Sequence, residues 1–67
     1  MIEFTLNGEP RRTEAPLSVA RLIEDLGYAG KRVAVEMDGA IVPKSRHAET
    51  PIENGGRLEI VIAVGGG

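Results

Sequence analysis

The sequence predicts an α+β fold, a mixed sheet of five strands with one main helix packed on one face. Three observations carry this prediction. Apolar and polar residues alternate with a period of two in residues 2–6 and 57–62. Asn7-Gly8 and Asp38-Gly39, which are typical of hairpin turns, follow strand-like runs. Residues 19–26 have apolar residues at helical spacing. With 67 residues, the chain is expected to form one domain.

The first hairpin begins at the N-terminus. Alternation in residues 2–6 indicates a strand with one buried face. Asn7 and Gly8 tolerate the positive φ that two-residue turns require. Residues 9–15 are polar and contain Pro10, which favours a strand at the sheet edge, where a missing N–H does not interrupt the ladder.

The helix has a start signal and a stop signal. Ser18 is the expected N-cap because its hydroxyl can accept a hydrogen bond from an unpaired N–H of the first turn. Gly27 is expected to end the helix as the C′ residue. A helix this short is not stable alone in water, so its apolar face must pack on the sheet. That face consists of Val19, Leu22, Ile23 and Leu26.

A second hairpin follows the helix. Residues 32–37 and 40–42 are strand-like and flank Asp38-Gly39, and Pro43 ends the second of them.

The rest of the chain supplies one more strand. Residues 44–53 are expected to be irregular, with one helical turn and with Ile52 as the anchor to the core. Asn54-Gly55-Gly56 predicts a turn, and residues 57–62 predict the last strand, with Leu58 and Ile60 facing inward.

The resulting element order, β-β-α-β-β-β, places the first and last strands as parallel neighbours at the centre of the sheet. This is the arrangement of the β-grasp, or ubiquitin-like, fold. We assign residues 1–62 to the β-grasp domain and residues 63–67 to a flexible C-terminal tail with a GG ending. Fold alone does not determine function.

Composition limits the possible functions. The chain is 42% hydrophobic and 27% charged, has a net charge of -2, and contains one Tyr and one Phe. Without a basic stripe or aromatic surface, we expect no nucleic-acid partner. No cysteine is present, which excludes disulfides, thiolate metal sites and thiol catalysis. We expect no bound metal or cofactor. No membrane span or signal peptide is visible, and we expect a cytoplasmic protein.

The glycines at the end of the chain carry the main hypothesis. Gly65, Gly66 and Gly67 follow the last strand after only two residues. Five extended residues reach about 17 Å beyond the sheet. Because Gly65 and Gly66 lack Cβ atoms, they can thread a narrow channel in a partner. We expect the α-carboxylate of Gly67 to react after adenylation by ATP. The competing interpretation is an inert, disordered end, as is usual for termini.

Other candidates are weaker. His47 has no partner nucleophile nearby in the sequence and is interpreted as an exposed loop residue. Asp38 is explained by its turn and Glu36 as a solvent-facing strand residue, so we do not expect them to form a catalytic acid pair. Asn54-Gly55-Gly56 lacks the strand-to-helix context of a phosphate loop. We therefore expect no catalytic residue in this chain.

Three apolar residues near the tail are candidates for docking a partner. They are Val61, Ile62 and Val64. Val61 is expected on the opposite sheet face from Leu58 and Ile60, and exposed apolar residues beside a functional tail suggest a docking surface. Ordinary partial burial is the alternative.

Residues 32–45, 56–61 and 63–67 resemble the sulfur carrier family of thiamine thiazole biosynthesis, ThiS. The Asn7-Gly8 turn and the helix end at 22–27 are similar too, so the resemblance runs nearly end to end. Three residues depart from the usual family pattern. His47 stands where an aromatic residue is expected, Asp38 where Asn is usual, and Gly56 where Asp is common. None of them lies in the tail.

The resemblance implies a mechanism and a set of partners. An E1-like adenylyltransferase would use ATP to adenylate the carboxylate of Gly67. A sulfur donor, such as a cysteine desulfurase, would convert it to a thiocarboxylate, and thiazole synthase would use that sulfur to build the thiazole ring. The chain would then be a protein co-substrate and not an enzyme. The alternatives are a molybdopterin synthase small subunit, a ubiquitin-like modifier conjugated to lysines, and a β-grasp interaction module with an inert tail.

Overall fold

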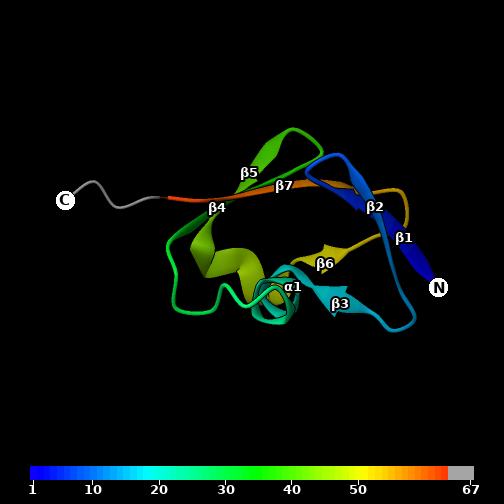
Figure 1. The fold of residues 1–67 in the computed structure, drawn as a ribbon, viewed down its shortest axis with the longest axis horizontal. Coiled ribbons are helices and arrows are strands. Elements are labelled where there is room, and N and C mark those ends of the chain that lie inside the picture. The colour runs from blue at the N-terminus through cyan, green and yellow to red at the C-terminus, as the bar shows by residue number, and fades with distance from the viewer. Residues whose placement is uncertain (64–67) are drawn as a thin grey trace.

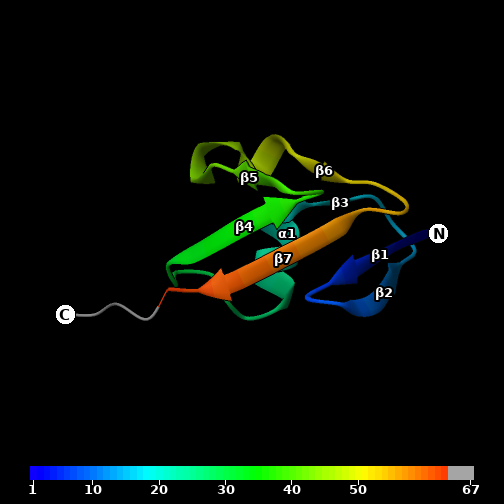
Figure 2. The same ribbon diagram turned by 90° about the horizontal axis from the view of Figure 1, so that it is seen from above.

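Five strands form the main sheet, in the order β2-β1-β7-β4-β5 (Figures 1 and 2). The structure is a computed structural model that describes residues 1–63. One helix, α1 (Val19–Asp25), lies against one face of the sheet (Figure 1). The strands are β1 (Ile2–Leu6), β2 (Glu9–Thr13), β4 (Val33–Met37), β5 (Ala40–Val42) and β7 (Arg57–Ile62).

The strand pairing confirms the predicted fold. Strands β1 and β7 are parallel, with Thr5 opposite Arg57 and Leu6 opposite Leu58. The pairs β1–β2, β4–β5 and β4–β7 are antiparallel. A mixed five-stranded sheet with its first and last strands side by side, crossed by one helix, is the β-grasp arrangement.

Both predicted hairpin turns are confirmed by the backbone. Asn7 and Gly8 have φ of 52° and 83°, and Asp38 and Gly39 have φ of 51° and 87°. Positive φ at both central residues is the mark of the type I′ turn, whose twist matches that of the flanking strands.

The helix begins and ends at the predicted signals. The Ser18 hydroxyl accepts a hydrogen bond from the Arg21 N–H at 3.1 Å. At the other end Gly27 has φ of 80°, and its N–H donates to the Glu24 carbonyl oxygen. The Tyr28 N–H donates to the Ile23 carbonyl oxygen, which completes a Schellman motif. Leu26 is the C-cap, so the helix is shorter than residues 19–26.

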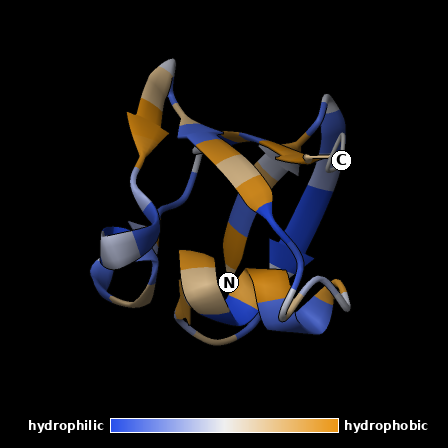
Figure 3. Cartoon of the chain, turned by 90° about the vertical axis from the view of Figure 1, so that its left-hand side faces the viewer, coloured by the Kyte–Doolittle hydropathy of each residue, from blue (hydrophilic) through white to orange (hydrophobic). Residues whose placement is uncertain are grey.

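The core lies between the sheet and α1. Apolar and polar bands alternate along the strands, as the period-two pattern predicts (Figure 3). The buried apolar residues are Phe4, Leu6, Val19, Leu22, Ile23, Val35, Ile52, Leu58 and Ile60.

Residues 44–53 are more regular than predicted. Residues Lys44–Glu49 form a 3₁₀ helix, η1. Strand β6 (Pro51–Ile52) then pairs with β3 (Leu17–Ser18) in a second, two-stranded sheet. The predicted helical turn is confirmed by η1. The expectation that the rest of the segment is irregular was wrong, because two-residue strands have no periodicity and form only when the fold brings both together. Ile52 is 2% exposed, which confirms it as the anchor.

Candidate functional site

Strand β7 carries the chain toward the predicted reactive end. It lies between β1 and β4, and Ile62 pairs with Val33 at its last position. The Ala63 N–H donates to the Arg32 carbonyl oxygen at 2.8 Å, so the pairing extends one residue past the strand. The predictions for Val64, Gly65, Gly66 and Gly67 lie outside the described residues and stay predictions, as does the division at residues 62 and 63.

Two turn residues hold β7 in register. The Asn7 side-chain amide donates to the Ile60 carbonyl oxygen at 3.1 Å, and its Oδ1 accepts from the Ile60 N–H at 2.9 Å. Asp38 Oδ1 accepts from the Arg57 N–H at 2.9 Å. The sequence predicted both residues only as turn formers. Their side-chain hydrogen bonds to β7 could not be predicted, because β7 is distant in the sequence and comes close only in the folded chain.

The Asn54-Gly55-Gly56 turn joins β7 to the start of β1. Asn54 Oδ1 accepts from the Glu3 N–H at 2.8 Å, and the Gly55 N–H donates to the Glu3 carbonyl oxygen. Gly55 has φ of 85°, which only glycine adopts readily. Both hydrogen bonds hold the turn before β7 against Glu3 of β1, in agreement with the interpretation of these glycines as a turn.

The sheet face opposite α1 carries exposed apolar residues on β7, β4 and β5. Val61 is 60% exposed and pairs with Ala34. Ile41 of β5 is 76% exposed and pairs with Glu36, which also pairs with Glu59. We call Ala34, Ile41 and Val61 the outer apolar patch. The sequence prediction missed Ile41, although it alternates with the inward-facing Val42 and so shows the period-two signal.

Ile62 and Val61 face opposite sides of the sheet. Successive side chains of a strand alternate, so Ile62 shares the side of the buried residues Leu58 and Ile60. It is nevertheless 40% exposed, because it lies at the end of the strand. The two candidate docking residues are therefore both accessible, but a flat partner surface that covers the outer apolar patch can contact Val61 and not Ile62.

His47 differs from the sequence prediction. It is 8% exposed, and its Nε2 donates to the Val42 carbonyl oxygen at 3.1 Å. The interpretation as an exposed loop residue was wrong. Most residues near His47 in the sequence are polar, so the sequence did not indicate that it is buried. In the structure, the 3₁₀ helix places the His47 ring against β5.

The acidic residues form no catalytic constellation. Glu36 is exposed on the outer sheet face, and the carboxylate of Asp38 is engaged with the Arg57 backbone. Within residues 1–63 no three His, Asp or Glu side chains lie close enough to hold a metal ion. No helix in the same residues is long and apolar enough to span a membrane.

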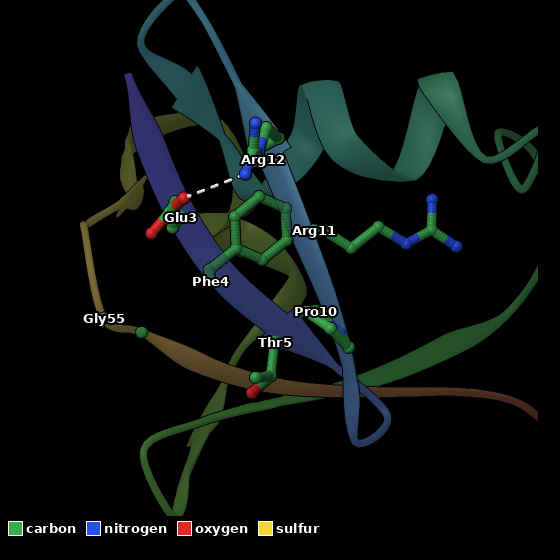
Figure 4. Close-up of a pocket in the computed structure, with 8 residues that line it drawn as sticks. Glu3, Phe4, Thr5, Pro10, Arg11, Arg12 and Gly55 are labelled. Atoms are coloured by element: carbon green, nitrogen blue, oxygen red, sulfur yellow. Dashed lines mark ion pairs between the residues drawn. The ribbon is translucent and has the colours of Figure 1, made fainter.

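A hollow of about 460 Å³ lies beside the first hairpin (Figure 4). Residues of β1 and β2 and the Gly55–Gly56 turn line it. Its ion pair joins Arg12 to Glu3 at 3.4 Å, and both side chains are exposed. Arg12 is already paired with Glu3, Arg11 is a single further cation in the lining, and Phe4 belongs to the core. This hollow is therefore no candidate for chemistry.

Comparison with known proteins gives a consistent result. The model of the ThiS family matches residues 4–67. A crystal structure of the thiamine biosynthesis protein ThiS from Geobacter metallireducens superposes with a TM-score of 0.82 at 28% identity, covering 98% of this chain and 100% of the other.

Two relatives extend the comparison. A thiazole synthase from Paramagnetospirillum magneticum is 41% identical over 66 residues, which cover 98% of this chain. The chain spans only 20% of the length of that relative. The uncharacterized protein ycf40 from Pyropia yezoensis is 33% identical over 66 residues, and 93% of its length is covered.

Proposed function

Because the chain belongs to the ThiS family, we propose that it is a sulfur carrier of thiamine biosynthesis, acting as a protein co-substrate of partner enzymes. The observation that carries this proposal is the extent of the family match. It covers residues 4–67 and therefore includes the whole of β7 and the glycines that follow it.

The first step of the proposed mechanism is activation of the tail. A free carboxylate resists nucleophiles because it is already negatively charged. In an E1-like adenylyltransferase, an oxygen of the Gly67 carboxylate attacks the α-phosphorus of ATP and pyrophosphate leaves. The product is a mixed anhydride with AMP as a good leaving group. Gly65 and Gly66 allow the tail to enter a narrow channel, because they have no Cβ atoms.

The second step loads the sulfur. The terminal sulfur of a persulfide, supplied by a donor such as a cysteine desulfurase, attacks the carbonyl carbon of Gly67, and AMP leaves. A thiol of the partner enzyme then attacks the sulfur–sulfur bond of the acyl disulfide, so that a disulfide forms on the partner side and the sulfur on Gly67 is released as a thiocarboxylate. With free sulfide as the donor, the thiocarboxylate forms directly when AMP leaves. The resulting thiocarboxylate then supplies sulfur to thiazole synthase. The carrier needs no thiol of its own, which agrees with a sequence that contains no cysteine.

Two features of the folded chain support this role. Strand β7 is held between two neighbours and by the side chains of Asn7 and Asp38, so the tail starts from a fixed position. The outer apolar patch, which includes Val61, offers a surface for the adenylating partner. The thiazole synthase relatives, which contain a stretch similar to this chain, favour thiazole synthase as the consumer of the sulfur.

The test is an intact-mass measurement of the 67-residue chain after incubation with the adenylyltransferase, ATP and sulfide. We expect the mass increase of one oxygen replaced by one sulfur, with the change located at Gly67 by fragmentation. A chain whose Gly67 carboxylate is converted to an amide is the control, because it has no carboxylate to adenylate at this end, and it should stay unchanged. If the full chain also stays unchanged in the presence of an active adenylyltransferase, the carrier proposal is wrong.

The same material separates the alternatives. Loaded carrier added to thiazole synthase should yield the thiazole product. Sulfur transfer to a pterin precursor instead would identify a molybdopterin-type carrier. Conjugates between Gly67 and lysine side chains would identify a ubiquitin-like modifier.

A further inference from the structure

A second cavity lies at the end of the sheet where β7 finishes. Its volume is about 310 Å³. One wall is the loop between α1 and β4, with Lys31 and Arg32. The opposite wall is η1, with Lys44 and His47. The side chains of Ile23 and Val33 contribute an apolar floor. Three cationic side chains thus surround one small hollow with an apolar base.

The loop wall is built by a tight turn. The Lys31 N–H donates to the Tyr28 carbonyl oxygen at 2.9 Å, and Gly30 has φ of 84°. A glycine with positive φ at the third position of such a turn is typical of type II. The turn brings the chain back from the helix end and places two consecutive cations, Lys31 and Arg32, at the rim of the cavity.

The opposite wall is set by 3₁₀ geometry. Residues three apart eclipse each other in a 3₁₀ helix, so Lys44 and His47 share one face of η1. The ring of His47 is fixed by its hydrogen bond to the Val42 carbonyl oxygen. Lys44 and His47 thus line the same cavity as Lys31 and Arg32.

The charge of this cavity is uncompensated by the described chain. No acidic residue lines it. Within residues 1–63 only Arg12, Arg21 and Arg46 form ion pairs with carboxylates. In the same range Arg11 and Arg57 are without an acidic partner, as are Lys31, Arg32 and Lys44, but only these last three line one hollow together. The chain as a whole has a net charge of -2, so the positive charge here is a local concentration. Converging Lys and Arg side chains are the usual donors to phosphate oxygens.

We propose that this cavity binds the phosphate group of a small phosphorylated molecule. The cations would hold the phosphate oxygens, and Tyr28 with the apolar floor would contact a short organic body. The volume is near the lower end of small-molecule sites, about 300–1,000 Å³, so it suits a phosphate with a few attached carbons. The proposal concerns the cavity alone and does not depend on the sulfur chemistry of Gly67.

The test is a titration of the isotope-labelled chain, followed by the amide resonances. The probes are inorganic phosphate and glycerol phosphate, with sodium chloride at equal ionic strength as the salt control. We expect saturable shifts at residues 30–33 and 44–47, with glycerol phosphate binding more tightly than inorganic phosphate. Shifts that are linear, or the same in chloride, would overturn the proposal.

Two variants on the same helix provide a matched comparison. Lys44→Gln removes a cation from the cavity and should weaken glycerol phosphate binding about tenfold, as expected for one charge-assisted hydrogen bond. Arg46→Gln removes the same charge from η1, but Arg46 pairs with Glu49 and does not line the cavity. Its affinity should match that of the unmodified chain. Equal weakening by both variants would mean general charge attraction and would refute a defined site.

Discussion

Asn7 does two separate tasks. Its backbone has φ of 52° in the first hairpin turn, and its side chain makes both hydrogen bonds that a neighbouring strand would make with Ile60. Direct strand pairing of β1 with β7 ends at Leu6 and Leu58. The Asn7 side chain extends this parallel pairing by two residues along β7, toward the end that leads into the tail.

Replacing Asn7 separates the two tasks. Asn7→Gly keeps the positive φ but loses both side-chain hydrogen bonds, so we expect the free energy of unfolding to fall by about 2 kcal/mol. Asn7→Ala should cost about 1 kcal/mol more, because alanine is also strained at positive φ. Urea denaturation measures both. A neutral Asn7→Gly variant would show that the hydrogen bonds to Ile60 contribute nothing to stability.

At the scale of single elements, the junction of β3 and α1 rests on Ser18. Its backbone pairs with Pro51 in the small sheet, and its hydroxyl caps the helix. The helix has seven residues, too few to be stable without its cap and its packing. Ser18 therefore links the two-stranded sheet of β3 and β6 to α1, the helix that covers the core.

We expect Ser18→Ala to lower the free energy of unfolding by about 1 kcal/mol, because one N–H of the first turn loses its acceptor. Ser18→Asp keeps an acceptor and should stay close to the unmodified chain. Ser45→Ala, at an exposed position of η1, is the control. Equal effects of Ser18→Ala and Ser45→Ala in urea denaturation would contradict the capping role.

The same elements show what could be predicted from the sequence. Both hairpins, the helix and its ends follow from local chemistry, since positive φ, capping and periodicity act within a few residues. The helical turn expected in residues 44–53 is present as η1, but the pairing of β3 with β6 and the burial of His47 could not be predicted that way. The pairing joins two-residue segments that are distant in the chain, and the mostly polar residues around His47 carry no periodic signal.

The candidate site could likewise be predicted only where the signal is local in the sequence. Alternation along β7 correctly placed Val61 on the outer face, and exposure of Ile41 follows from the same rule once β5 is known. The role of the Asn7 side chain could not be predicted, because Ile60 lies 53 positions further along the chain. In the proposed mechanism Gly67 reacts only on partner enzymes. The glycines at the end of the chain suggested that reactivity, and the resemblance to the ThiS family implied the partners.

At the scale of the whole molecule, charge and apolar surface are separated. The outer apolar patch, with Glu36 and Glu59 beside it, occupies one sheet face near the end of β7. The cationic cavity lies on the other side of the same sheet end, between the loop before β4 and η1. The proposed docking surface and the proposed phosphate site therefore lie on opposite faces of the sheet.

This separation makes the docking role of Val61 testable. Val61→Asp places a carboxylate where an apolar partner surface would exclude water, so we expect the KM of the chain in the adenylation reaction to rise about tenfold or more. The kcat should change little, because Gly67 and its chemistry are intact. Initial rates of pyrophosphate release measure both constants.

The control for Val61→Asp is Ala15→Asp, which adds the same charge at an exposed residue between β2 and β3. Its KM should stay unchanged. Urea denaturation of both variants checks that β7 remains folded, since aspartate is a poor strand former. If Val61→Asp folds and keeps the KM of the unmodified chain, the adenylating partner does not use the outer apolar patch. The adenylating partner must then recognise another part of the chain. In either case, neither variant should change the affinity of the cationic cavity for phosphate.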